Sequence, residues 1–316
     1  MTGIIETRGL TKLFAGDRGV RDIHLQVGRG QVFGFLGPNG AGKSTFVKML
    51  VGLLRPTAGE ASVLGFPIGD LGARRRIGYL PELFRYQAWL TAEEVLRFHG
   101  RLCRMDASHI EKRIQEVTSA VGLARRAQER VQGYSKGMQQ RLGLACALLP
   151  EPEVLFLDEP ASALDPGGRR EVRQLLLQLR DEGMTVFLNT HLLEDVEAVC
   201  SDVALLMNGR IRAQGTVTDI LQSEPVWEFT IGGWTPDLSM PLQERVAHLD
   251  VGLKVGATDE QGVTVLEATL QDSEQAAWLN ATLHELGVSV YTVYPRQHRL
   301  ESWFMTLTET QGGEAK

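Results

Sequence analysis

A glycine-rich segment near the start of the chain constrains the fold more than any other feature. Residues 37–45 read Gly-Pro-Asn-Gly-Ala-Gly-Lys-Ser-Thr, and they follow the apolar run 31–36 and precede a stretch with helical periodicity. Gly37, Gly40 and Gly42 let the backbone turn tightly and aim its N–H groups at phosphate oxygens, because no Cβ stands in the way. The pattern predicts a strand–loop–helix cradle for the phosphates of a nucleoside triphosphate.

Each part of this loop has a predicted task. Lys43 reaches the β- and γ-phosphates, and Ser44 offers its hydroxyl to Mg²⁺. The helix that follows, with Phe46, Met49 and Leu50 facing inward, presents its positive N-terminal end to the anion. A glycine-rich turn that matches by chance is the weaker alternative, because a strand precedes this one and a helix follows it. The predicted nucleotide contacts are Gly37, Pro38, Asn39, Gly40, Ala41, Gly42, Lys43, Ser44 and Thr45.

The amino-acid composition limits the classes of protein to which this chain can belong. The chain has 316 residues, of which 43% are hydrophobic and 23% charged, enough for one large or two moderate cores. A formal net charge of −6 gives no whole-chain reason to bind nucleic acid. Without a long apolar run or a secretory signal, we expect a cytoplasmic chain that does not itself span a membrane. Three widely spaced cysteines predict reduced, mostly buried thiols and no zinc site: Cys103, Cys146 and Cys200.

The first two thirds of the chain alternate short apolar runs with helical patterns. From residue 4 to about residue 216 this is typical of an α/β domain on a mostly parallel sheet. Between residues 90 and 131 the pattern is wholly helical, with Val95, Phe98 and Leu102 on one predicted face. We predict an α/β domain over residues 1–222 with a helical subdomain inserted at about 83–135. The strongest predicted strands are residues 32–36, 154–157, 186–188 and 203–207.

A change in residue composition along the chain predicts a second domain. Pro225, Gly232, Gly233 and Pro236 cluster near the junction and predict a boundary at about residue 223. The order beyond it is β-α-β-β-α-β, as in the split βαβ, ferredoxin-like arrangement. We predict a small α+β accessory or dimerisation domain over residues 223–316. Its predicted elements are strand 227–231, helix 242–249, strands 251–255 and 263–270, helix 273–286 and strand 288–293.

Two adjacent acidic residues narrow the range of reactions that this chain can be expected to catalyse. Residues 153–160 read Glu-Val-Leu-Phe-Leu-Asp-Glu-Pro, a buried strand that ends in Asp158 and Glu159. Asp158 is predicted to hold Mg²⁺ through water, and Glu159 to orient and polarise an attacking water. A purely structural role would leave two carboxylates at a buried strand end without a cation, which is energetically costly.

A second anion site is predicted in residues 134–141, Tyr-Ser-Lys-Gly-Met-Gln-Gln-Arg. Ser135 takes an N-cap position and Gly137 the first turn of an apolar helix. Together with the phosphate loop and the acid pair, this segment resembles the signature of ABC transporter nucleotide-binding subunits, usually written Leu-Ser-Gly-Gly-Gln. The resemblance covers residues 4 to about 222 and implies a P-loop ATPase fold. It also implies a head-to-tail dimer, in which one subunit's signature contacts the γ-phosphate held by the other.

The same resemblance implies roles for single residues. Phe14 lies where an aromatic ring stacks on adenine, with a core phenylalanine as the alternative. Glu82 stands where a glutamine usually touches Mg²⁺ and senses the membrane partner. Asp165, in Ser-Ala-Leu-Asp, matches the loop that couples the two ATP sites. His191 matches the histidine that contacts the γ-phosphate and helps to position water, although a lone histidine is otherwise read as structural.

Three positions depart from the family pattern. Lys136 replaces a glycine and Met138 a glutamine in the signature, while Glu82 replaces the usual glutamine. We expect activity with altered coupling, since Glu82 still offers a carboxylate oxygen to a hard cation. The predicted signature contacts are Ser135, Lys136, Gly137 and Met138, and the predicted Mg²⁺ ligands are Ser44, Glu82 and Asp158.

The implied function is an ATP-hydrolysing subunit of a bacterial ABC exporter. Residues 299–304, Arg-Leu-Glu-Ser-Trp-Phe, resemble the tail of drug-resistance, sodium-export and nitrous-oxide-reductase-maturation ATPases, which pair with separate multi-span membrane proteins. The resemblance implies a homodimer or heterodimer, a peripheral position on the inner face of the plasma membrane and no nucleic-acid partner. The segment after Glu82 either lines the groove for the membrane partner or closes the helical subdomain; its apolar residues are Phe84, Tyr86, Trp89 and Leu90.

Two other functions stay open on the sequence. One is a soluble ABC protein acting on the ribosome or on DNA, against which a single cassette, no heptad run and a negative net charge argue. The other makes the C-terminal domain a ligand sensor that regulates the ATPase. A ligand-dependent ATPase rate that disappears on truncation after Leu221 would distinguish the sensor.

Overall fold

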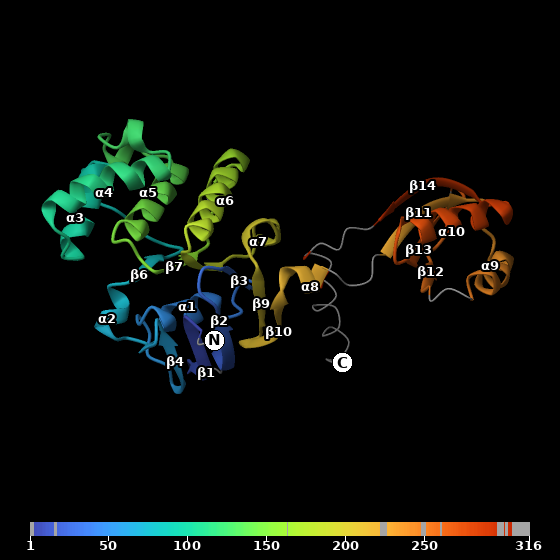
Figure 1. Ribbon diagram of the computed structural model, residues 1–316, viewed down its shortest axis with the longest axis horizontal. Helices are drawn as coiled ribbons and strands as arrows, with labels where there is room; N and C mark the ends of the chain where they lie inside the picture. Colours follow the sequence, from blue (N-terminus) through green and yellow to red (C-terminus); the bar gives the residue numbers. More distant parts are fainter. Residues whose placement is uncertain are drawn as a thin grey trace. The chain divides into compact units, whose positions relative to one another are not determined.

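The computed structural model describes residues 3–15, 18–162, 164–221, 226–247, 251–259, 261–295, 300 and 303–304. The chain divides into two compact units, one ending at Val217 and the next beginning at Thr218 (Figure 1). This division lies a few residues before the boundary expected at about residue 223. Three of the six residues of the tail segment 299–304 lie outside the described residues.

A six-stranded sheet in the order β10-β9-β3-β8-β7-β6 forms the centre of the first unit. All its neighbouring strands are parallel except β9 and β10. Strands β3, β7 and β8 are buried along their whole length, because parallel strands are covered on both faces. The four predicted strands are therefore confirmed. The bounds are β3 Val32–Leu36, β6 Ile77–Leu80, β7 Val154–Asp158, β8 Thr185–Asn189, β9 Asp202–Met207 and β10 Arg210–Thr216.

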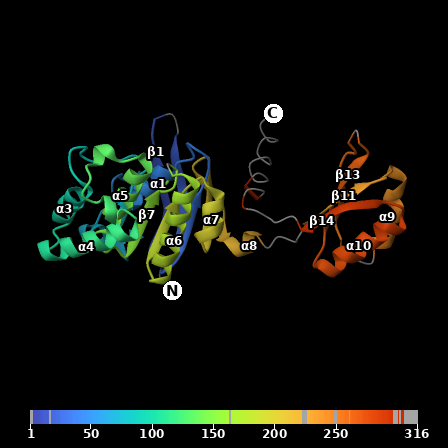
Figure 2. The same cartoon turned by 90° about the horizontal axis from the view of Figure 1, so that it is seen from above.

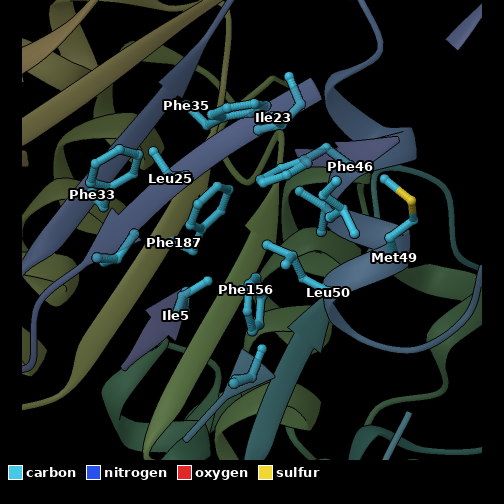
Figure 3. Close-up of a cluster of buried hydrophobic side chains, with 14 of the residues drawn as sticks. Ile5, Ile23, Leu25, Phe33, Phe35, Phe46, Met49, Leu50, Phe156 and Phe187 are labelled. Atoms are coloured by element: carbon cyan, nitrogen blue, oxygen red, sulfur yellow. The ribbon is translucent and has the colours of Figure 1, made fainter. Parts of the chain in front are cut away.

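An antiparallel sheet and the first helix complete this core. The sheet has the order β2-β1-β4-β5, with β1 Ile5–Leu13, β2 Gly19–Val27, β4 Ala58–Val63 and β5 Phe66–Pro67. Helix α1, Lys43–Leu50, packs against the central strands through Phe46, whose ring centroid lies 4.8 Å from that of Phe35 (Figure 3). Phe156 and Phe187 from the next strands join the same cluster. Aromatic packing thus fixes α1 relative to β3, and with it the loop between them.

The helical subdomain consists of α3 Ala92–Leu102, α4 Ala107–Ala120 and two short 3₁₀ turns, Ala124–Arg126 and Val131–Gly133. Figures 1 and 2 show α3 and α4 gathered with α5, Lys136–Leu148, at one end of the unit. The predicted face of α3 is wrong in part: Val95 is buried, but Phe98 is 45% and Leu102 65% exposed. Gly100 takes the inner position instead, because its missing side chain admits Ile110 of α4.

The remaining helices of the first unit are α2 Leu71–Arg74, α6 Pro166–Asp181, α7 Leu193–Val199 and α8 Val217–Leu221, the last of which crosses into the second unit. None of the described helices is long and apolar enough to cross a membrane. All three cysteines are free; Cys200 is buried and Cys146 half-buried, but Cys103 is exposed, contrary to expectation.

The described part of the second unit contains a four-stranded antiparallel sheet and helices that pack against it. Its strand order is β12-β13-β11-β14, and the element order along the chain is that of the split βαβ unit. Phe229 and Leu266 from the sheet pack with Leu279 and Leu283 of α10 in a separate core. The bounds are β11 Val226–Gly232, a 3₁₀ turn Pro236–Leu238, α9 Ser239–Val246, β12 Leu253–Val255, β13 Val263–Thr269, α10 Ser273–Glu285 and β14 Ser289–Pro295.

Candidate nucleotide-binding site

The glycine loop between β3 and α1 has the backbone that only glycine supports. Gly37, Gly40 and Gly42 have φ of +157°, +82° and +107°. A Cβ on Gly37 would lie 2.3 Å from the carbonyl oxygen of Leu206, and one on Gly42 would lie 2.5 Å from Cγ1 of Val20. Around Gly40 the space within 4 Å is open. The loop therefore packs tightly at both ends and leaves its middle free for a ligand.

Lys43 is a buried cation without a carboxylate partner. It is 7% exposed, and its Nζ donates to the carbonyl oxygens of Gly37 at 2.8 Å and Pro38 at 3.3 Å. Burial lowers the pKa of Lys43, while the charges of Glu159, Asp158 and Glu82 act in the opposite direction. Among the described residues no acid forms an ion pair with it. Its ammonium group is therefore available to an anion that enters the loop.

Asp158 ends β7 beside two polar donors. It is 1% exposed; Ser44 Oγ donates to its Oδ1 at 3.2 Å, and Asn189 Nδ2 donates to the same oxygen. Burial raises the pKa of Asp158, and the hydrogen bonds from Ser44 and Asn189 oppose this shift. The Asn189 Oδ1 atom and the Tyr79 hydroxyl are buried without a hydrogen-bond partner among the described groups. Carboxylate, hydroxyl and amide oxygens of this kind fit Mg²⁺, a hard cation.

Glu159, the next residue, is held on several sides. His191 Nδ1 lies 2.8 Å from its Oε1, and Thr190 Oγ1 donates to its Oε2 at 3.4 Å. The Glu159 backbone N–H donates to the Asn189 carbonyl oxygen at 2.8 Å, and Gln140 Nε2 donates to the Glu159 carbonyl oxygen at 3.4 Å. Its φ is +55°, a conformation that costs a non-glycine residue about 1–3 kcal/mol. The surroundings thus impose one orientation on this carboxylate.

These groups surround a single pocket of about 370 Å³, a volume suited to a small-molecule ligand. The glycine loop and the start of α1 line it together with residues that follow β6, β7 and β8. The structure therefore brings the predicted phosphate loop, Glu82, Glu159 and His191 together. The lining residues are Asn39, Gly40, Gly42, Lys43, Ser44, Thr45, Glu82, Glu159, Ser162 and His191.

The predicted signature residues line a different pocket, of about 550 Å³, which shares no residue with the first. Ser135 caps α5, as predicted, by accepting the Met138 N–H at 3.2 Å. Asp165 caps α6 by accepting the Gly168 N–H at 2.8 Å. Lys136 is exposed beside them. One chain thus brings only part of the predicted site residues to each pocket.

Phe14 stands at the end of β1. It is 47% exposed, and Lys12 Nζ lies 5.6 Å from its ring centroid, which excludes a core phenylalanine. Its neighbour Leu13 pairs with Gly19, and the Gly19 carbonyl would lie 3.3 Å from a Cβ on Gly42. The end of this hairpin therefore lies next to the glycine loop, although Phe14 does not line the first pocket.

Comparison with known proteins identifies the family. A family model described as ABC transporter matches residues 20–162. An uncharacterized ABC transporter ATP-binding protein of Synechocystis is 39% identical over 239 residues, which are 73% of this chain and 68% of that protein. The chain belongs to the ABC transporter ATP-binding protein family. It is accordingly an ABC-type ATPase that binds ATP, and the predicted P-loop fold is confirmed.

One further relative and two solved structures extend the comparison. Linearmycin resistance ATP-binding protein LnrL of Bacillus subtilis is 29% identical over 316 residues, 96% of this chain and 98% of that protein. Among solved structures, an ATP-binding subunit of an ABC transporter has a TM-score of 0.63 at 32% identity, with 69% of this chain and 92% of that chain covered. An ATP-binding cassette solved as a dimer after hydrolysis, with ADP and Pi, has a TM-score of 0.62 at 26% identity, over 67% of this chain and 98% of that chain.

Several residues of this ABC ATPase site were not predicted from the sequence. Asn189, Thr190, Gln140 and Ser162 contact the acid pair or line its pocket. For Asn189 a signal existed, since it ends the buried strand β8 and pairs in register with Asp158. Gln140 lies on an apolar helix, and its contact with the Glu159 carbonyl joins segments 19 residues apart, which no local pattern predicts.

Proposed function

We propose that this chain is the ATP-hydrolysing subunit of a bacterial ABC exporter that works as a head-to-tail dimer beneath separate membrane subunits. The observation that carries the proposal is the separation of the two pockets. The phosphate loop, Glu159 and His191 line one, whereas the signature residues Ser135 to Met138 line the other. A second subunit supplies the missing half of each site.

In this proposal the chain's own residues divide the work at the reacting phosphate. Lys43 exchanges its bonds to the Gly37 and Pro38 carbonyls for bonds to the β- and γ-phosphates, and the loop N–H groups bind the same oxygens. Glu159, held by His191 and Thr190, accepts a proton from the attacking water. Ser44, Asp158 and Glu82 would hold Mg²⁺, which would supply positive charge beside the phosphates.

The proposals of export and of a membrane partner are supported by other observations than the two pockets. LnrL is named for linearmycin resistance, and a relative from Cupriavidus pinatubonensis that is 36% identical over 226 residues is named for Nod factor export. The first name describes resistance to a compound and the second describes export of one, and together they favour export here. The chain would then lie at the inner face of the plasma membrane, bound through its permease.

The helical subdomain provides the surface for that permease. Phe84 and Tyr86 face inward, since their ring centroids lie 5.3 Å apart and Tyr86 stands 5.5 Å from His99. Leu83 and Trp89 instead are 87% and 68% exposed. Of the apolar residues predicted after Glu82, Phe84 and Tyr86 therefore pack inward, whereas Trp89 is exposed. Trp89 and Leu83 are the part of this segment that fits a membrane partner.

The test is a trapped dimer. Glu159→Gln removes the base and should lower kcat about 10²- to 10⁴-fold while ATP binding and ATP-dependent dimerisation persist. Glu182→Gln, at the exposed C-cap of α6, is the matched control and should keep the wild-type rate. A Glu159→Gln protein that hydrolyses ATP at the control's rate would remove Glu159 from the role of base.

The same variant identifies the partner. Trapped with ATP in membranes of its own cells, it should retain a multi-span protein without a cassette of its own, and the purified partner should change the ATPase rate of the wild-type chain. Lys43→Ala, which cannot hold ATP, should lose this retention. Recovery of ribosomes or DNA in place of a membrane protein would overturn the transporter assignment in favour of a soluble mechanoenzyme.

A further inference from the structure

The signature pocket contains three basic side chains, and two of them are already paired. Arg126 Nη1 lies 3.1 Å from Glu129 Oε2, and Arg141 Nη1 lies 2.5 Å from Glu171 Oε2. The acid of this pocket, Asp165, is engaged as the cap of α6. Lys136 is exposed and has no hydrogen bond or ion pair within the described part of the chain. It is therefore the one described cation of this pocket that is free to meet an incoming charge.

The phosphate-loop pocket has the opposite charge. Lys43 faces three carboxylates, those of Glu82, Asp158 and Glu159, whose charges all act on it. A bound triphosphate adds further negative charge to this face, and Mg²⁺ offsets only part of it. Glu82 is the exposed member of the three, whereas Asp158 and Glu159 are buried. It is therefore the carboxylate that a second molecule can neutralise.

We propose that Lys136 of one subunit is the electrostatic counterpart of Glu82 in the other, across the bound triphosphate. This inference rests on the head-to-tail dimer of the proposed function, because only that arrangement turns the signature pocket toward the partner's phosphate loop. Two of the three departures from the family pattern, Lys136 and Glu82, then have one cause. The added negative charge of Glu82 in each site is balanced by the added positive charge of Lys136 from the facing subunit.

The partner that fits this arrangement is a second copy of this chain. A copy carries Lys136 and Glu82 together, so a two-fold symmetric dimer contains the charge pair twice. A subunit with the usual glycine and glutamine at these positions would leave one glutamate and one lysine of this chain without a counterpart. Charges at an interface select partners in this way, because an unmatched charge is penalised when the interface closes.

The experiment is a double-mutant cycle on dimer formation in the full-length chain with Glu159→Gln, in ATP and Mg²⁺, measured by sedimentation. Lys136→Gln should raise the dimer dissociation constant about tenfold when Glu82 is present, and less than about threefold when Glu82→Gln is also present. Lys112→Gln, an exposed lysine of α4 outside both pockets, is the matched control and should change the constant by less than about twofold. ATP affinity of each monomer is measured alongside, so that a loss of nucleotide is not counted as a loss of dimer.

Mixing variants tests whether the two charges act between chains. Lys136→Glu and Glu82→Lys should each weaken the homodimer, whereas their mixture should dimerise more tightly than either alone, since each site of the mixed dimer then pairs opposite charges. Equal effects of Lys136→Gln in both backgrounds, or no gain on mixing, would overturn the charge pair and leave the head-to-tail dimer intact. Absence of an ATP-dependent dimer in the parent Glu159→Gln chain would instead overturn the proposed function and this inference with it.

Discussion

The two pockets of the ATPase unit are built in opposite ways. In the phosphate-loop pocket, Lys43 and Glu159 are each 7% exposed and are held by hydrogen bonds to the loop and to residues after β8. Asp158, which accepts a hydrogen bond from Ser44 of this pocket, is 1% exposed. In the signature pocket, Ser135 and Lys136 are exposed and lie at the first residues of a helix. The first pocket is complete in its geometry before a ligand arrives. The second becomes enclosed only when another molecule covers it, so the comparison separates what one chain can do from what two chains do.

The largest expected effect comes from the buried cation. Lys43→Ala removes two charge-assisted hydrogen bonds to phosphate, each worth about 1.5–3 kcal/mol, so ATP affinity should fall at least about 100-fold. Lys48→Ala, an exposed lysine on the same helix, is the control and should bind ATP normally. Titration calorimetry with the monomeric chain measures both. Unchanged affinity in Lys43→Ala would show that the glycine loop is not the phosphate cradle.

Mixing extends this test to the second pocket. Lys43→Ala damages the phosphate loop of its own chain, whereas Ser135→Ala damages a signature that serves the other chain. In a head-to-tail mixed dimer both defects fall in one site, and the other site is intact. ATPase activity of the mixture above that of either variant alone supports the division of each site between two chains, and its absence contradicts it.

Substitution of Asp158 should have a smaller effect, and it should raise the stability of the chain while it lowers the ATPase activity. Burial raises the pKa of Asp158 above its value in the unfolded chain. The contribution of this carboxyl group to folding stability is therefore full below the unfolded pKa, and it is lost as the pH rises through the folded pKa. At neutral pH the ionised carboxylate therefore destabilises the nucleotide-free fold. Asp158→Asn keeps an oxygen for Asn189 and Ser44 but removes the charge. We expect a Tm higher by about 2–4 °C at pH 7 without nucleotide, a gain that shrinks as the pH is lowered.

The same substitution should impair catalysis. Loss of a charged Mg²⁺ ligand should lower kcat about tenfold to a hundredfold at fixed Mg²⁺. Calorimetric melting and an Mg²⁺ titration of the ATPase rate measure the two effects on one protein. A lower Tm in Asp158→Asn would mean that the carboxylate stabilises the empty site, contrary to its burial.

The sequence predicted the phosphate-loop pocket well because its parts are local. Strand β7 is a short apolar run that ends in Asp158 and is followed directly by Glu159, so motif and strand end coincide. What it missed are contacts between segments distant along the chain. The φ of Glu159 and the hydrogen bond from Gln140 depend on where α5 packs, which no spacing encodes.

The helical subdomain shows the same limit. Val95, Phe98 and Leu102 fit one helical face, yet only Val95 is buried, because the partner helix α4 presents Ile110 opposite Gly100. Periodicity reports which residues share a face of a helix, but the face that is covered depends on the neighbour. The exposed apolar residues left by this packing became visible only in the structure.

The smallest expected effect tests where the phosphate-loop pocket ends. Phe14 lies at the hairpin end next to Gly42 but outside the pocket, and stacking on adenine would extend the site to it. Phe14→Ala should lower ATP affinity about threefold, the lower range for an aromatic pair, and Phe14→Tyr should restore it. Phe66 is a matched control, because it is 36% exposed and also has a cation beside its ring. Phe66→Ala should leave affinity unchanged. Equal losses in both alanine variants, or a loss in Phe14→Ala that accompanies a fall in Tm, would assign Phe14 a role in folding and confine the site to the glycine loop and the strand ends.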